Sequence, residues 1–190
     1  LLVDEFQDTS PLQLDLLKRL TAGWQAGDGR TLFAVGDPMQ SIYRFRKAEV
    51  GLFLRAAQTG IGGLRLTPLR LSRNNRSCPE VVDWINTHFP AVFPPDDDQV
   101  RGEIRYRPFV ATRATLPQAG VVMHPLVLDA QADDEAAARL EAQTIIELIA
   151  AERQADRQSN SRRIAVLVRA RNHLAVLVAA LRRRAAQCPP

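Results

Sequence analysis

The first 60 residues alternate short apolar runs with stretches of helical period. Residues 1–3 and 31–35 (TLFAV) are apolar runs of strand length that end at charged or turn-forming residues. A helix is expected between them, and a second helix is expected over 48–58. The inward face of this second helix would carry Val50, Phe53, Leu54 and Ala57. The order strand, helix, strand, helix predicts the α/β class, a parallel sheet covered by helices.

The helix between the two apolar runs has clear boundary signals. Ser10 can cap it, Pro11 suits its first turn, and Gly23 can end it. Its apolar stripe comprises Leu12, Leu16, Leu17 and Leu20. We therefore expect these four leucines to face the core.

A glycine-containing stretch without periodicity, residues 58–66, follows the second helix. We place a domain boundary there, so that the domains are 1–62 and 63–190. Ser77 and Glu80 then have the spacing of a capping box, which predicts the start of another helix. Its inward face would carry Val82, Ile85 and Phe89.

The rest of the chain repeats the alternation after a proline-rich loop. Strands are expected over 121–128 and 164–168, with a long helix over 133–154 between them. Asn172 can cap a last helix. The apolar stripe of that helix comprises Leu174, Leu177, Val178 and Leu181.

Composition changes this picture only slightly. The 190 residues are 46% hydrophobic, which indicates a globular protein, and the net charge of +4 favours a phosphate-rich partner. Two distant cysteines and three scattered histidines predict neither a disulfide framework nor a metal cluster. No run is long enough for a membrane span. We expect a cytoplasmic, reducing compartment and no membrane partner.

An acidic pair at the end of the first strand is the first candidate for chemistry. Ligands of open parallel sheets bind beyond the carboxyl ends of the strands, and Asp4 and Glu5 stand at such an end. In nucleotide hydrolases an aspartate there holds Mg²⁺, and a neighbouring glutamate can accept a proton from the attacking water. The alternative is that both are merely polar residues that leave a strand.

A second polar cluster, GDPMQSIYRFRKA, follows the second strand. Gln40 would lie at the same sheet edge as Glu5 and could contact a terminal phosphate. Tyr43 and Phe45 alternate with Arg44 and Arg46. This pattern suits single-stranded nucleic acid, whose bases would stack on the rings and whose phosphates the arginines would neutralise. The alternative is that the two rings simply pack in a core. A third cluster, LRLSRNNRS, places Arg76 directly before a helix, as either an arginine finger or a solvated residue.

Three stretches resemble motifs II, III and IV of the superfamily-one helicases of the UvrD/Rep/PcrA type, both in their residues and in their order along the chain. They are LLVDEFQDTS, VGDPMQSIYRFR and LRLSRNNRS. Two longer stretches resemble the AddA- and RecB-like branch of these helicases, which serves double-strand-break repair and recombination. They are GDPMQSIYRFRKAEVGLFL and IAVLVRARNHLAVLVAALRR. The resemblance implies P-loop NTPase, RecA-like parallel sheets with flanking helices. Residues 1–62 would end a first motor domain, and residues 63–190 would begin a second.

The resemblance also implies roles for individual residues. Asp4 would hold Mg²⁺, Glu5 would be the general base, and Gln40 would sense the γ-phosphate of ATP. Arg76 would be the arginine finger. The DNA-binding residues would be Tyr43, Phe45 and Arg46, which would face single-stranded DNA.

The sequence departs from the family at two positions. Lys47 replaces a common glycine, and Asn75 stands where an aromatic residue of the nucleotide pocket is usual. No phosphate-binding G-x-x-x-x-G-K-[ST] loop is present, so we expect a fragment that is inactive alone.

The parent would be an ATP-dependent helicase that moves 3′ to 5′ on single strands, binds single- and double-stranded DNA, and works with a nuclease partner subunit. One alternative is a magnesium nuclease built on Asp4, Glu5 and Asp8, although TLFAV lacks the lysine that such sites use. Another is a non-catalytic module that binds DNA or a protein.

Overall fold

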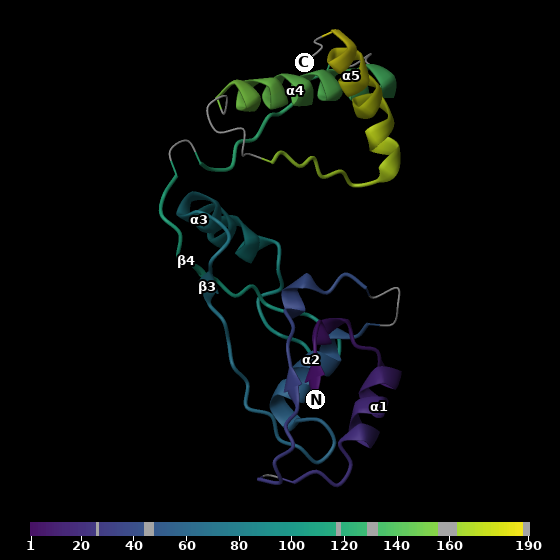
Figure 1. The fold of residues 1–190 in the computed structure, drawn as a ribbon, viewed down its shortest axis with the longest axis vertical. Coiled ribbons are helices and arrows are strands. Elements are labelled where there is room, and N and C mark those ends of the chain that lie inside the picture. The colour runs from purple at the N-terminus through teal and green to yellow at the C-terminus, as the bar shows by residue number, and fades with distance from the viewer. Residues whose placement is uncertain (26, 44–47, 117–118, 129–132, 156–162, 188–190) are drawn as a thin grey trace. The chain divides into compact units, whose positions relative to one another are not determined.

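The computed structural model describes residues 1–25, 27–43, 48–116, 119–128, 133–155 and 163–187. The chain divides into two compact units, Leu1–Val122 and Met123–Pro190. In Figure 1 the first unit runs from purple to teal and contains α1, α2 and α3, and the second contains α4 and α5. The boundary between motor domains at residue 62 stays a prediction.

Two short parallel strands begin the fold. β1 (Leu2–Val3) pairs with β2 (Phe33–Ala34) in the register Leu2 to Phe33 and Val3 to Ala34. The backbone N–H of Phe6 extends the pairing by donating to the carbonyl of Val35 over 2.8 Å. The two apolar runs of the sequence are therefore adjacent parallel strands, as predicted, and the α/β class is confirmed.

α1 (Pro11–Leu20) connects these strands and begins as predicted. The Ser10 hydroxyl accepts from the backbone of Gln13, and the Gln13 side chain accepts from the backbone of Ser10 over 2.9 Å. Pro11 occupies the first turn, where its missing N–H costs no hydrogen bond. The Gln13 side chain completes a capping box. The sequence pattern predicts only the serine of this box.

The leucine stripe predicted for α1 is wrong at three of its four positions. Leu17 is buried, but Leu12 is 80% exposed, and Leu16 and Leu20 are also more than half exposed. The helix instead turns Leu14 and Leu17 toward the core, next to Phe6. Period alone could not decide between these faces, because the leucines of this helix spread over more than half of its circumference.

α2 (Val50–Thr59) closes the same core. Ala56 and the following Ile61 are buried against Phe6 and Leu17, and Phe53 packs on Phe6 with 5.9 Å between ring centroids. The predicted inward face is correct at Leu54, which is buried, and wrong at Ala57, which is exposed.

A second two-stranded parallel sheet joins β3 (Arg73–Asn74) to β4 (Val110–Ala111). α3 (Pro79–His88) packs beside it through Val82, which is 1% exposed. The Asn86 amide ties the helix to the chain before β4, because it donates to the carbonyl of Phe109 over 2.8 Å. Its oxygen accepts from the Tyr106 hydroxyl over 2.6 Å.

The predicted capping box of α3 is not formed. Cys78, not Ser77, is the N-cap, and its side chain makes no capping hydrogen bond. The backbone of Ser77 is instead held by the Asn74 side chain over 2.8 Å. The turn after β3 therefore uses Ser77, and the helix starts one residue later, at Pro79.

The second unit is a pair of packed helices. α4 (Asp134–Ala155) confirms the predicted long helix, and it packs on α5 (Leu174–Gln187) through the buried Ala142 and Leu177. Asn172 does not cap α5, because it lies in a 3-10 turn, Arg171–His173, that precedes the helix.

The strands predicted over 121–128 and 164–168 are wrong. Both segments are described, and neither has a partner strand. Leu167, for example, is 94% exposed. Apolar runs are strands only where a neighbouring strand satisfies their backbone groups. No helix in the described part of the chain is long and apolar enough to cross a lipid bilayer.

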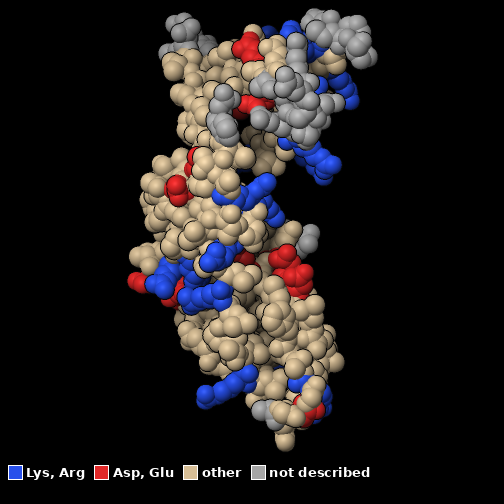
Figure 2. Space-filling view, turned by 60° about the vertical axis from the view of Figure 1, so that its left-hand side comes forward, with Lys and Arg blue, Asp and Glu red and all other residues tan. Residues whose placement is uncertain are grey.

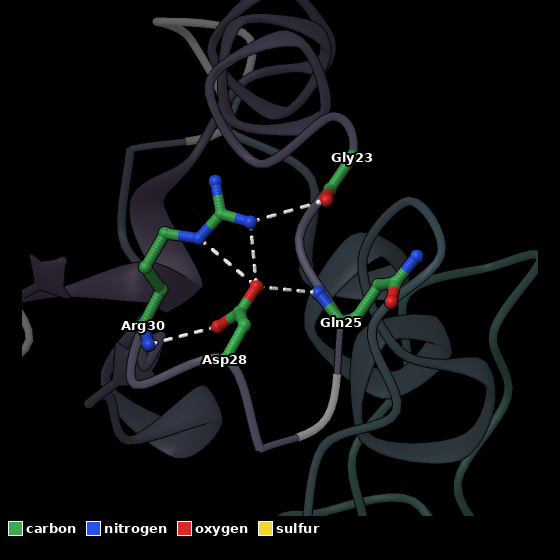
Figure 3. A network of polar contacts seen from close by, with 4 residues as sticks. All are labelled: Gly23, Gln25, Asp28 and Arg30. Atoms are coloured by element: carbon green, nitrogen blue, oxygen red, sulfur yellow. Dashed lines mark hydrogen bonds and ion pairs between the residues drawn. The ribbon is translucent and has the colours of Figure 1, made fainter.

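A polar network holds the loop between α1 and β2 (Figure 3). The Asp28 carboxylate accepts from the backbone of Gln25 over 2.7 Å and from two nitrogens of the Arg30 guanidinium over 2.6 and 2.9 Å. The same guanidinium donates to the carbonyl of Gly23 and lies 5.4 Å from the Trp24 ring. These hydrogen bonds lower the pKa of Asp28 from 3.8 to about 2, chiefly through Arg30.

This network predicts a pH dependence of stability. A carboxyl whose pKa is lowered by folding stabilises the fold above its unfolded pKa and loses that effect as pH falls through its folded pKa. The melting temperature of the wild type should therefore exceed that of Asp28→Asn at neutral pH, and the difference should disappear as pH falls from about 4 to about 2. Because the group is exposed, salt should reduce the difference. A difference that persists at the lowest pH would contradict this role.

Candidate functional site

The carboxyl ends of β1 and β2 lie at one edge of their sheet, because the strands are parallel. Asp4 and Glu5 follow β1, and Gly36 and Asp37 follow β2. Glu5 has φ 51° and ψ 42°, and it is the one residue other than glycine with positive φ in the described ranges. This left-handed conformation turns the chain sharply after β1, and the backbone N–H of Glu5 donates to the Asp4 carboxylate over 2.9 Å.

The Gln7 side chain connects the two strand ends. Gln7 is 1% exposed, and its amide nitrogen donates to the Glu5 carboxylate over 2.6 Å. Its amide oxygen accepts from the backbone N–H of Asp37 over 3.0 Å. One buried side chain therefore fixes Glu5 relative to the turn after β2.

The turn after β2 continues this network to Gln40. The Asp37 carboxylate caps the short 3-10 helix Pro38–Gln40 by accepting from the backbone of Met39 over 3.0 Å. Its other oxygen accepts from the Gln40 amide over 2.7 Å. The Gln40 side chain is exposed beside Asp37. Hydrogen bonds thus run from Glu5 through Gln7 and Asp37 to Gln40, and so connect two of the predicted site residues.

A pocket of about 340 Å³ opens beside the acidic pair. It is lined by Val3, Asp4, Glu5, Asp8, Thr9, Gln13, Leu16 and Leu17. Its carboxylate oxygens are the ligands that Mg²⁺ prefers, and Mg²⁺ usually takes only one or two carboxylates besides water and substrate phosphates. The described residues contain no group of three or more His, Cys, Asp or Glu that could hold an ion by itself. Asp4 and Glu5 therefore present exposed carboxylates beside this pocket.

Arg76 is held at the end of the other sheet. Its backbone N–H donates to the Asn74 side chain over 2.9 Å, and its carbonyl accepts from the Arg113 guanidinium over 2.9 Å. Its own side chain is exposed and has no hydrogen bond or ion pair within the described part of the chain. The structure therefore fixes the backbone of Arg76 and leaves its guanidinium accessible, without joining it to Asp4, Glu5 or Gln40.

The predicted DNA-binding residues are described only in part. Phe45 and Arg46 lie outside the described residues, as do Arg44 and Lys47. Tyr43 is half-buried, and its carbonyl accepts from the backbone of Ala48 over 3.3 Å. Elsewhere, Lys and Arg side chains form separate groups on the face seen in Figure 2.

Sequence reasoning overlooked Gln7. In the string DEFQD the three carboxylates are the candidates for chemistry, and the pattern assigns no role to Gln7 between them. A signal was present, because an amide directly after the buried Phe6 is in a position to be buried itself and must then find partners.

The left-handed backbone of Glu5 predicts an order of stability between two variants. Glu5→Gly and Glu5→Ala both remove the carboxylate, but only glycine adopts this conformation without strain. Glu5→Gly should therefore be more stable than Glu5→Ala by about 1–2 kcal/mol in denaturant unfolding. As a control, the same pair of substitutions at Glu49, whose φ is −130°, should favour alanine or be neutral. Equal stability at Glu5 would mean that the turn relaxes.

The first part of the chain is similar to a known protein family. Residues 1–60 match the model of the UvrD/REP helicase N-terminal domain. Proteins named as the A subunit of an ATP-dependent helicase/nuclease are similar over a longer stretch. The one from Exiguobacterium sibiricum is 43% identical over 109 residues, 55% of this chain and 8% of its own length.

Two further relatives with this name have similar identity. The protein from Staphylococcus carnosus is 41% identical over 110 residues, which cover 56% of this chain and 8% of its own length. The protein from Bacillus cereus is 39% identical over 140 residues, 70% of this chain and 11% of its own length. The chain thus spans about a tenth of the length of these curated relatives. Its resemblance to the UvrD-like helicases, on the branch of the helicase/nuclease A subunits, is confirmed.

Proposed function

We propose that the chain is a segment of an ATP-dependent DNA helicase that moves 3′ to 5′ along single strands in double-strand-break repair and recombination. The observation that carries the proposal is the network from Glu5 to Gln40 at the common carboxyl end of two parallel strands. This edge is where open α/β sheets bind ligands. The relatives are named as A subunits of an ATP-dependent helicase/nuclease, which supports the same activity.

Asp4, Glu5 and Gln40 would divide the chemistry of ATP hydrolysis among them. All three side chains are exposed at the sheet edge, so a bound nucleotide can reach them. Asp4 would hold Mg²⁺, which would neutralise charge on the phosphates. Glu5 would accept the proton of the attacking water, and Gln40 would donate its amide N–H to the γ-phosphate. Hydrolysis releases that phosphate, so Gln40 would lose a hydrogen-bond partner and would thereby sense that the nucleotide has been hydrolysed.

Arg76 would act as the arginine finger. Its backbone is fixed from both sides by Asn74 and Arg113, whereas its guanidinium is exposed. A planar guanidinium suits the two-pronged contact with phosphate oxygens that stabilises developing charge. The residue is therefore positioned and still available to a nucleotide.

DNA would bind beside the turn after β2. Tyr43 and Phe45 would stack on bases of a single strand, and Arg46 would contact its phosphates. The net charge of +4 is consistent with this partner. Exposed arginines such as Arg70, Arg73 and Arg105 would add phosphate contacts, whose number would set the salt dependence of binding.

The wider organisation follows from the same proposal. Residues 1–62 and 63–190 would be parts of two RecA-like motor domains in a cytoplasmic protein that works with a nuclease partner subunit. The chain contains no phosphate-binding loop, so these residues alone would not hydrolyse ATP. The experiments therefore use the full-length protein.

Glu5→Gln tests the assignment of the general base. In the full-length protein it should keep ATP affinity and lower DNA-stimulated hydrolysis by about 10²–10⁴-fold, the usual effect of losing a positioned base. The measurement is steady-state ATPase activity together with equilibrium binding of nucleotide. Asp15→Asn, which removes an exposed carboxylate of α1 that pairs with Lys18, is the matched control and should have a normal rate. Normal hydrolysis by Glu5→Gln would show that another group is the base.

Arg76→Ala tests the arginine finger. It should lower the catalytic rate by about 10³-fold or more and change nucleotide affinity little, because a finger stabilises charge that develops in the transition state. Arg76→Lys should restore little, since the planar fork is lost. Arg65→Ala removes the same charge from an exposed position to which no role is assigned, and serves as control. Weak ATP binding with normal turnover in Arg76→Ala would instead make Arg76 a binding residue.

A further inference from the structure

We propose that Gln7 is a positioning residue that sets the orientation of the Glu5 carboxylate and links it to the Gln40 side of the site. The inference rests on the proposed function, since it concerns the same ATPase site. Gln7 itself is 1% exposed, so it would not touch the nucleotide. It would act through Glu5, whose carboxylate it contacts over 2.6 Å.

The geometry uses both ends of the Gln7 amide. The nitrogen donates to Glu5, and the oxygen accepts from the backbone of Asp37 over 3.0 Å. The nitrogen also makes a longer contact of 3.4 Å with the Asp8 carboxylate, whereas the oxygen has Asp37 as its partner, so loss of Asp37 would leave a buried acceptor unsatisfied. A displacement of the turn that carries Asp37 would therefore move the amide and, with it, the Glu5 carboxylate.

The Asp37 end leads directly to the proposed sensor. The Asp37 carboxylate accepts from the Gln40 amide over 2.7 Å, and the backbone of the same residue donates to Gln7. A phosphate that drew the Gln40 amide away from Asp37 would change the turn that Gln7 contacts. Gln7 would thus make the orientation of the base depend on the occupancy of the sensor.

Gly36 shows how closely the two strand ends meet. A Cβ at this position would lie 2.4 Å from the Gln7 amide oxygen and 3.0 Å from the Gln7 backbone nitrogen. Alanine at Gly36 must therefore push the Gln7 side chain away from Asp37. This gives a second way to disturb Gln7 without changing it.

Gln7→Met in the full-length protein tests the role, because methionine keeps the length of the side chain and removes its hydrogen bonds to Glu5, Asp8 and Asp37. It should lower kcat for DNA-stimulated ATP hydrolysis by about 10²-fold, the effect of a misplaced catalytic group, and leave KM for ATP nearly unchanged. Gly36→Ala should lower kcat in the same way. Gly63→Ala, at a glycine with no heavy atom within 4 Å of the added Cβ, is the matched control. Normal kcat in both Gln7→Met and Gly36→Ala would overturn the inference.

A double variant separates positioning from general stability. Once Glu5→Gln has removed the base, there is no carboxylate left to orient, so adding Gln7→Met should cause no further loss of kcat. An equal loss in both backgrounds would make Gln7 merely structural. The two proposals fail differently: normal hydrolysis by Glu5→Gln overturns the proposed function, whereas a large loss there with normal Gln7→Met and Gly36→Ala overturns the positioning role alone.

Discussion

The end of β1 depends on burying one amide side chain with both of its polar groups satisfied. Gln7 lies under the turn that carries Glu5 and bonds to the turn after β2. Each polar group of this amide would cost about 1–3 kcal/mol if it were left without a partner. The ends of β1 and β2 must therefore keep their positions relative to Gln7. The close approach of Gly36 to Gln7 and the left-handed backbone of Glu5 are found at the same two strand ends. The acidic pair is therefore built into the sheet edge.

Local signals in the sequence predicted what local physics decides. The capped start of α1 at Ser10 and Pro11 and the long helix α4 depend on neighbouring residues, and both are confirmed. The buried face of α1 depends on which elements surround it, and the exposed Leu12 was therefore predicted wrongly. The same reason applies to 164–168, where an apolar run predicts a strand but only a partner strand makes one.

The same distinction between local and long-range interactions applies to the candidate site. That Asp4, Glu5 and Gln40 share one sheet edge followed from two apolar runs and the rule for parallel strands, and β1 and β2 bear out that edge. The link between them did not follow, because it depends on the side chain of Gln7 reaching Asp37 thirty positions away. At Ser77 the side chains of Asn74 and Glu80 are alternative acceptors for the backbone N–H, and Asn74 accepts it. The Asn74 oxygen takes the backbone N–H groups of both Arg76 and Ser77, and so the turn displaces the expected cap.

The two parts of the candidate site are attached to different sheets. Glu5, Gln7 and Asp37 are tied to β1 and β2, whereas Arg76 is tied to β3 and β4 through Asn74 and Arg113. No hydrogen bond or ion pair between described residues joins the Arg76 guanidinium to the acidic pair. A triphosphate carries the negative charge that would attract this guanidinium and, with Mg²⁺, offset the repulsion from Asp4 and Glu5. Binding would then draw the ends of both sheets toward one ligand, and hydrolysis would weaken that attraction.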